Sequence, residues 1–282
     1  MNYAVLGAGG LGGLVGAALA RAGHPVTLIV RDPGHPRVIS VESAVLGTFE
    51  ATVTIVTELA EPVDALWLTT KATQLEGALP SAPARFVTGT AVPLLNGVDH
   101  VARLREVYPS VTPGAIRVES ERVAPGRIRQ PGPFILVDLA GPLAAEIAVE
   151  LSAAGIKTNV RQDEASLLWQ KLLILAPMAL TTTATQRAIG GVRDDVQWRE
   201  RLLGVLEEAG AVAQAEGAVL DVEAARQGIL SMPDGMRSSM QKDRAAGRAL
   251  ELDAIAGPIL RGGRAHGIAT PHTQVLASML GA

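Results

Sequence analysis

The feature that most constrains the fold is a glycine-rich turn that directly follows an apolar strand at the start of the chain. The apolar stretch Tyr3–Leu6 precedes the letters GAGGLG at residues 7–12, a helix of small residues continues to Ala22, and a second apolar stretch runs from Val26 to Val30. A strand, a glycine turn, a helix and a second strand in this order form the opening βαβ unit of a dinucleotide-binding sheet.

The glycine spacing matches G-x-G-x-x-G, in which each glycine has its own role. We expect Gly7 to make the tight turn, Gly9 to let the backbone approach a pyrophosphate, and Gly12 to let the helix pack closely on the strand. The free N–H groups and the positive dipole end at the start of the helix, at Gly10 and Leu11, then favour phosphate binding. The sequence predicts that these five residues contact the cofactor.

The residues after the second strand indicate which dinucleotide is bound. Arg31 follows Val30 directly, and Asp32 comes one place later. An arginine at this position favours the 2′-phosphate of NADP, and Arg37 is placed where it could assist. In the alternative interpretation Arg31 is a solvated loop residue and Asp32 binds the ribose hydroxyl.

Composition excludes several classes of function. The 282 residues are 48% hydrophobic, enough for a sizeable core and two domains. The 25 basic and 28 acidic residues leave no positive surplus for binding nucleic acid. With no cysteine and five scattered histidines, a metal site is not expected.

Two apolar runs resemble targeting or membrane segments in composition. The run Asn2–Ala20 lacks a basic start and carries the glycines of the nucleotide turn. The run Leu172–Arg187 is interrupted by Pro177 and is too short to cross a bilayer. We therefore expect a soluble, cytoplasmic protein that does not interact with membranes.

Polar residues follow two further apolar strands of the first half. Lys71 comes directly after the stretch Asp64–Thr70, and Asn96 ends the stretch Ala91–Leu95 and is followed by Gly97. Ligands bind outside the carboxyl ends of parallel strands, so both side chains are predicted to line the same crevice as the glycine turn. In the alternative interpretation the lysine is solvated and Asn-Gly is only a turn signal.

The remaining pattern divides the chain into a dinucleotide-binding domain at residues 1–162 and an all-helical domain at residues 163–282. The predicted elements of the first are a hairpin or short crossover strands within residues 37–56, further strands at 111–119, 127–130, 134–139 and 156–160, and helices from residue 98 and at 144–154. Asp163 can cap a new helix. The helices that follow are predicted to break near Gly190-Gly191, Met232-Pro233 and Gly262-Gly263, and Thr270-Pro271 is predicted to be a stop signal. The fold class is α/β, with an N-terminal Rossmann-type domain followed by an all-α domain.

Lys171 is the most informative residue of the second half. Leu167 and Leu168 lie one turn before it and Ile174 and Leu175 one turn after it, so its face of the helix is apolar. Burial would disfavour the charged ammonium and suit the lysine to proton donation near neutral pH. Alternatively, the stem packs on the protein while the amine reaches water.

The ordered set of motifs resembles the ketopantoate reductase family along nearly the whole chain. The motifs, in order, are VLGAGGLG at residues 5–12, TKA at 70–72, NG at 96–97, LWQKL at 168–172, SSMQKD at 238–243, ELD at 251–253 and RAHGIATP at 264–271. The resemblance implies an NADPH-dependent oxidoreductase that acts on a small carbonyl substrate, reducing a 2-oxo acid to a 2-hydroxy acid, as in pantothenate biosynthesis. A homodimer is compatible with it, and the sequence leaves the oligomeric state open.

The same resemblance assigns roles to individual residues. It implies that Lys171 is the general acid, that Glu251 supports it, that Lys71 and Asn96 lie by cofactor and substrate, and that Ser239 meets the substrate carboxylate. A cation that can also donate a proton suits the negative charge that develops on the carbonyl oxygen. From the sequence alone, Glu251 would be a surface carboxylate and Ser239 a helix-side hydroxyl.

The chain departs from the family at two substrate-binding positions. Leu175 and Ala179 stand where the family usually carries asparagines that hold the hydroxyl end of the substrate. Loss of these amides weakens discrimination for a hydroxyl. Three hypotheses therefore remain: a reductase of ketopantoate or a close relative, a reductase of a more apolar 2-oxo acid, ketone or imine, and a non-catalytic NADP sensor.

Overall fold

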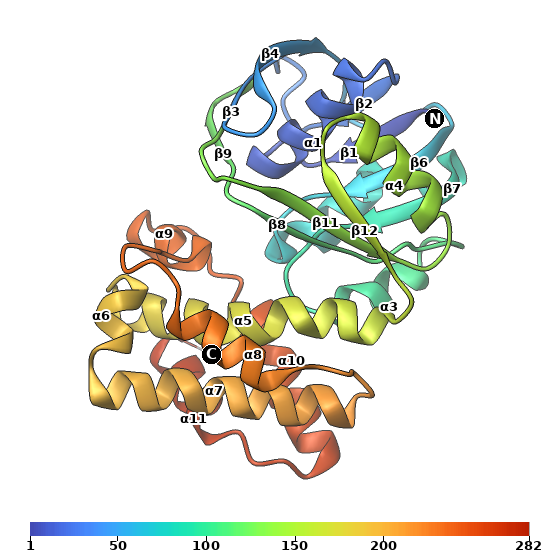
Figure 1. The fold of residues 1–282 in the computed structure, drawn as a ribbon. Helices are drawn as coiled ribbons and strands as arrows, with labels where there is room; N and C mark the ends of the chain where they lie inside the picture. The colour runs from blue at the N-terminus through green and yellow to red at the C-terminus, as the bar shows by residue number, and fades with distance from the viewer. Residues whose placement is uncertain (282) are drawn as a thin grey trace. The chain divides into compact units, whose positions relative to one another are not determined.

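The computed structural model describes residues 1–281, and the chain forms two compact units (Figure 1). Met1–Leu95 and His100–Glu164 make up the first, which we call the sheet unit. Asn96–Asp99 and the chain from Ala165 onward make up the second, the helical unit. The expected Rossmann-type fold followed by a helical region is confirmed.

A five-stranded parallel sheet organises the sheet unit, with strand order β5-β2-β1-β6-β7. The strands are β1 (Tyr3–Leu6), β2 (Val26–Ile29), β5 (Thr54–Val56), β6 (Val63–Leu68) and β7 (Val87–Pro93). Strand β1 pairs with β2 on one side and with β6 on the other, and Leu6 lies opposite both Ile29 and Leu68. The carboxyl ends of three neighbouring strands are therefore level at the point where the strand order reverses, which is where such sheets bind ligands.

Two smaller sheets complete this unit. One has the order β4-β3-β10-β9 and the other β12-β11-β8. Their strands are β3 (Val38–Ser43), β4 (Gly47–Thr52), β8 (Gly114–Val118), β9 (Glu121–Ala124), β10 (Arg127–Gln130), β11 (Ile135–Ala140) and β12 (Lys157–Arg161). The helices are α1 (Gly10–Arg21), α2 (Leu75–Ala78), α3 (His100–Arg105) and α4 (Ala144–Ala153). The predicted hairpin is confirmed because β3 and β4 pair antiparallel, whereas β9 was not predicted.

Helix α1 packs closely on strands because its buried face carries glycine. A Cβ atom at Gly13 would lie 2.6 Å from the side chain of Ile128 on β10, and one at Gly16 would lie 3.0 Å from Leu28 on β2. Leu14 and Leu19 of the same helix are fully buried in the core of the sheet unit. The close fit fixes where the helix begins, and therefore fixes the glycine turn.

From Glu164 onward, all regular elements in the described part of the chain are helices. They are α5 (Glu164–Thr185), α6 (Ile189–Arg193), α7 (Val196–Ala215), α8 (Val222–Leu230), α9 (Ser239–Ala245), α10 (Leu252–His266) and α11 (Pro271–Met279). Their core is built almost entirely from leucine, isoleucine, valine and alanine. Figure 1 shows α5 and α7 as the two long helices of this unit.

Of the three predicted helix breaks, the one near Gly190-Gly191 is confirmed, because α5 ends at Thr185 and the short α6 ends at Arg193. The one near Gly262-Gly263 is wrong, because both glycines lie inside α10. These glycines serve close packing. A Cβ atom at Gly190 would lie 2.8 Å from the side chain of Asp234, and one at Gly262 would lie 2.4 Å from Val212 on α7. The break before Met232-Pro233 is confirmed. The predicted helix end before Thr270-Pro271 is also confirmed, because α10 ends at His266, and Pro271 is in addition the first residue of α11.

Helix α5 continues through Pro177, so it is longer than the apolar run suggested. It spans 22 residues and is long and apolar enough to cross a bilayer, but 67% of its most apolar 18-residue window is buried inside the protein. The hydroxyl of Thr181 donates to the carbonyl of Pro177 at 2.7 Å. A proline inside a helix costs about 3 kcal/mol, which burial of the flanking apolar side chains offsets. Such burial is typical of the core helix of a soluble protein.

Candidate functional site

The glycine turn has the geometry that the spacing predicts. Gly7 follows β1 with φ of 102°, a conformation that favours glycine. A Cβ atom at Gly12 would lie 2.1 Å from the carbonyl oxygen of Gly7, so no side chain fits there. By contrast, a Cβ atom at Gly9 would meet nothing within 4 Å. The first and third glycines are required by the fold, and the second leaves its side of the turn open to a ligand.

The start of α1 is suited to a pyrophosphate. Helix α1 begins at Gly10, and its N-cap residue, Gly9, supplies no side-chain hydrogen bond. The N–H groups of the first turn, including that of Leu11, have no partner inside the helix and are available to phosphate oxygens. The Leu11 side chain packs partly against the core. The turn therefore fits the predicted dinucleotide.

Gly10 also has a packing role that the sequence did not reveal. A Cβ atom there would lie 2.7 Å from the carbonyl oxygen of Ser120 and 2.8 Å from Cα of Glu121. The Ser120 hydroxyl donates to the carbonyl oxygen of Gly10 at 2.8 Å. The segment between β8 and β9 thus closes over one side of the turn.

Thr69 is a second residue that sequence reasoning missed. Its hydroxyl lies 2.8 Å from the carbonyl oxygen of Gly7 and 3.1 Å from that of Leu6. It therefore ties the end of β6 to the glycine turn. Lys71 follows two residues later, half-buried, at the start of a short 3-10 helix, Ala72–Gln74.

Arg31 lies two residues beyond the end of β2, at the same edge of the sheet, and is exposed. Among residues 1–281 it makes no hydrogen bond or ion pair. Asp32 is already engaged, because its carboxylate accepts a hydrogen bond of 2.9 Å from the N–H of Gly34. Arg37 is exposed in the same loop. The sheet unit thus gathers the glycine turn, Arg31 and Lys71 at the carboxyl ends of β1, β2 and β6.

In the helical unit, Lys171 lies on α5 among apolar side chains. It is half-buried, with Leu168 before it and Leu172 after it, both buried in the core. Leu175 is half-buried, and Ala179 is completely buried in the helical core. The face of α5 that carries the lysine is apolar, as the sequence predicts.

Asn96 and Glu251 are joined in the same unit although 155 residues separate them. The amide nitrogen of Asn96 donates to the carboxylate of Glu251 at 3.1 Å. Glu251 is only 7% exposed and is the N-cap residue of α10. Gly97 has φ of 85°, and a Cβ atom there would lie 2.4 Å from the carbonyl oxygen of Ala254. The Asn-Gly pair is therefore both a turn and a close contact with α10, which places the amide on the glutamate.

Ser239 is the exposed first residue of α9, and its neighbour Ser238 is the buried N-cap residue of that helix. Ser238 is 1% exposed, and its hydroxyl caps α9 by accepting from the N–H of Gln241 at 3.1 Å. It also shares a hydrogen bond of 2.9 Å with the hydroxyl of Thr182 on α5. These contacts fix the start of α9 and leave Ser239 facing outward. Among residues 1–281, no group of three or more histidine, aspartate or glutamate side chains could hold a metal ion.

Two family models cover most of the chain. The model for ketopantoate reductase PanE/ApbA matches residues 3–137, and the model for its C-terminal domain matches residues 164–282. The curated 2-dehydropantoate 2-reductase of Mycobacterium tuberculosis is 36% identical, with 100% of this chain and 97% of the relative covered. That of Caulobacter vibrioides is 32% identical, with coverage of 100% and 98%.

Solved structures agree with this relationship. A PanE/ApbA family ketopantoate reductase from Ralstonia eutropha superposes with a TM-score of 0.89 at 27% identity, covering 99% of this chain and 97% of the other. A D-mandelate dehydrogenase in complex with NADH and anilino(oxo)acetate also has a TM-score of 0.89, at 25% identity with the same coverage. The chain therefore belongs to the ketopantoate reductase family, whose members are NADP-dependent oxidoreductases that act on a CH–OH group.

Proposed function

We propose that the protein uses NADPH to reduce ketopantoate, or a closely related 2-oxo acid, to the 2-hydroxy acid. The observation that carries this proposal is the hydrogen bond between Asn96 and Glu251. Both residues match family motifs, and the fold holds them together in the unit that carries Lys171. Proximity of this kind has no purely local cause, because the two residues are far apart in the sequence.

In this proposal Lys171 is the proton donor. NADPH supplies the hydride to the carbonyl carbon of the substrate. Negative charge then develops on the carbonyl oxygen, and the ammonium of Lys171 stabilises this charge and hands over a proton. Glu251, mostly buried, orients the polar groups around it, and Asn96 is held in place by the glutamate. Ser239, exposed at the start of α9, is assigned to the substrate carboxylate.

Arg31 is proposed to select NADPH over NADH. The Arg31→Ala variant is expected to weaken NADPH binding by about 1.5–3 kcal/mol, the range for a charge-assisted hydrogen bond, and to leave NADH binding nearly unchanged. Titration calorimetry with each nucleotide measures both constants. Equal losses for the two nucleotides would refute the role of Arg31.

A second candidate substrate is a more apolar 2-oxo acid. Leu175 and Ala179 offer hydrocarbon where the family usually offers amides, and a structural relative is a D-mandelate dehydrogenase crystallised with an aryl oxo acid. Because Ala179 is completely buried, Leu175 is the position at which substrate preference is best tested.

The Leu175→Asn variant is expected to raise kcat/KM for ketopantoate relative to an unhydroxylated 2-oxo acid such as 2-oxoisovalerate by about tenfold, since a new amide would hold the hydroxyl. Competition between the two substrates in one assay gives the ratio directly. Leu175→Met, of similar volume, is the control. An unchanged ratio in the asparagine variant would count against this assignment.

The proposed activity is tested by mixing the protein with NADPH and ketopantoate and following loss of nicotinamide absorbance. A panel that also contains 2-oxoisovalerate and phenylglyoxylate separates the two candidate substrates. Tight NADPH binding without turnover of any carbonyl in a broad panel would instead support the non-catalytic sensor.

A further inference from the structure

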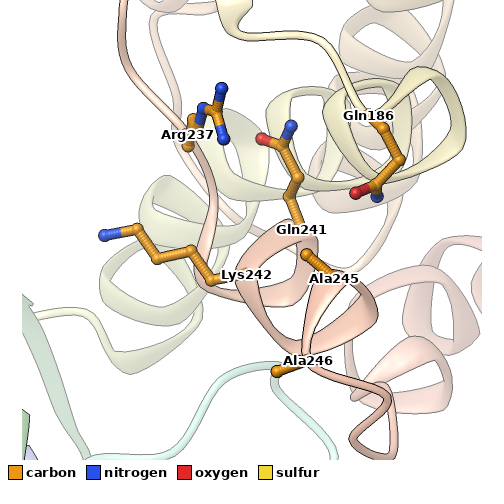
Figure 2. Close-up of a pocket in the computed structure, with 6 residues that line it drawn as sticks. All are labelled: Gln186, Arg237, Gln241, Lys242, Ala245 and Ala246. Atoms are coloured by element: carbon orange, nitrogen blue, oxygen red, sulfur yellow. The ribbon is translucent and has the colours of Figure 1, made fainter.

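A pocket of about 280 Å³ lies in the helical unit, and none of the residues assigned to reduction lines it. It is lined by Gln186, Arg237, Gln241, Lys242, Ala245 and Ala246 (Figure 2). Three of these residues come from α9 and Ala246 follows it, while Gln186 follows α5 and Arg237 precedes α9. The volume is just below the usual range of about 300–1,000 Å³ for ligand pockets, so it suits a small metabolite.

The pocket contains a buried hydrogen-bond acceptor. Gln241 is 2% exposed, and its amide nitrogen donates to the carbonyl oxygen of Arg187 at 3.1 Å. Its amide oxygen is buried and has no hydrogen-bond partner among residues 1–281. Nearly all buried polar atoms in native proteins have a partner, and leaving one without a partner is costly. A hydrogen-bond donor on a bound ligand would therefore satisfy this oxygen.

The charged residues of the pocket are both cations. Arg237 is exposed and makes no hydrogen bond or ion pair with the described residues. Lys242 is exposed on α9, and none of the six lining residues is acidic. In Figure 2 the amide oxygen of Gln241 is on the side of Arg237. A ligand that fills the pocket would therefore meet a positive charge next to a hydrogen-bond acceptor.

The pocket is separate from the proposed proton donor. Lys171 and Gln186 are 15 residues apart in sequence, and α5 connects them up to Thr185. At 1.5 Å per residue this places their backbones about 22 Å apart along the helix. A small molecule bound beside Gln186 would therefore be too far from Lys171 to be the substrate in its reactive position.

We propose that this pocket binds a small hydroxylated anion, either a carboxylate or a phosphate. Arg237 and Lys242 attract the anionic group, and a hydroxyl of the same molecule donates to the amide oxygen of Gln241. The alanines Ala245 and Ala246 provide a short apolar wall for the carbon chain. The ligand is a second small molecule, bound in addition to the cofactor and the carbonyl substrate.

The test compares matched ligands on the full-length protein by titration calorimetry. Glycerol 3-phosphate and propyl phosphate form one pair, and glycerate and propionate form the other. Within each pair the hydroxylated member is expected to bind about threefold to tenfold more tightly, as one added hydrogen bond allows. The pair that binds more tightly identifies the anion as phosphate or carboxylate. Equal binding within both pairs, or no binding, overturns the proposal.

Variants locate the site. Arg237→Ala is expected to weaken binding of the preferred ligand about tenfold or more, because it removes a charge-assisted contact. Arg199→Ala removes another exposed arginine of the helical unit, outside the pocket, and should bind like the original protein. Lys171→Ala should also retain binding, even if it abolishes reduction. Binding that survives Arg237→Ala but is lost in Lys171→Ala would place the ligand at the catalytic site and overturn the proposal.

Discussion

Replacing Lys171 with alanine is expected to lower kcat by about 10²- to 10⁴-fold, the usual contribution of a positioned general acid. The physical reason is that the variant lacks both the charge and the proton that stabilise the developing alkoxide. If the lysine acts only in the transition state, kcat and kcat/KM should fall together while NADPH binding stays unchanged. Steady-state rates and nucleotide calorimetry measure these three quantities.

The matched control is Lys157→Ala. Lys157 is an exposed lysine on the edge strand β12, so its removal should leave rates and stability unchanged. The variant Lys171→Arg retains the charge but cannot donate a proton near neutral pH, so it should remain strongly impaired. Full activity in either Lys171 variant would remove the lysine from the mechanism, while the family membership of the chain would stand.

The Gly12→Ala variant is expected to lose about 3 kcal/mol of folding free energy. The new Cβ atom would lie 2.1 Å from the carbonyl oxygen of Gly7 and 2.4 Å from the hydroxyl of Thr69, neither of which can move without displacing β1 or β6. Overpacking at a rigid site costs about 1–3 kcal/mol, and backbone contact places this variant at the upper end. For a unit of this size the melting temperature should fall by about 6–12 °C, as measured by calorimetry.

Gly9→Ala separates folding from nucleotide binding at the same turn. A methyl group at Gly9 meets nothing within 4 Å, and its φ of −78° suits alanine. The protein should therefore melt normally. The methyl group would point into the space proposed for the pyrophosphate, so NADPH should bind about tenfold more weakly or worse. Normal NADPH affinity in Gly9→Ala would contradict the proposed path of the cofactor.

The opening βαβ unit was predictable because local signals agree there. The strands β1 and β2, the glycine turn and helix α1 each follow from residues close in the sequence. The separation into three sheets was not predictable in this way. Strand β10 pairs in parallel with β3, and no local pattern indicates which strands so far apart in the chain will meet.

Glycine and proline signals do not by themselves show where a helix ends. Gly262 has the same sequence signature as a helix-ending glycine, but it lies inside α10, where a side chain would collide with Val212. Pro177 lies inside α5 without ending it, because burial on both sides of it outweighs the lost hydrogen bond. Such outcomes depend on tertiary contacts, which a single sequence does not display.

Within the candidate site, the backbone geometry of the glycine turn was predicted best. The roles of Gly7, Gly9 and Gly12 follow from geometry that any such turn requires. Thr69 and Ser238, which position the turn and α9, were missed because a threonine or serine offers no spacing signal to distinguish it from a solvated one. The hydrogen bond between Asn96 and Glu251 likewise became visible only in three dimensions.

The contact between Ser120 and Gly10 has a consequence for how the protein is made. A ribosome releases the GAGGLG segment early, but the residues that brace it emerge about a hundred codons later. In a nascent chain the glycine turn therefore lacks its contact with Ser120 until the segment after β8 has left the ribosomal exit tunnel. Coenzyme present during translation should assist the last steps of folding of this unit rather than the first.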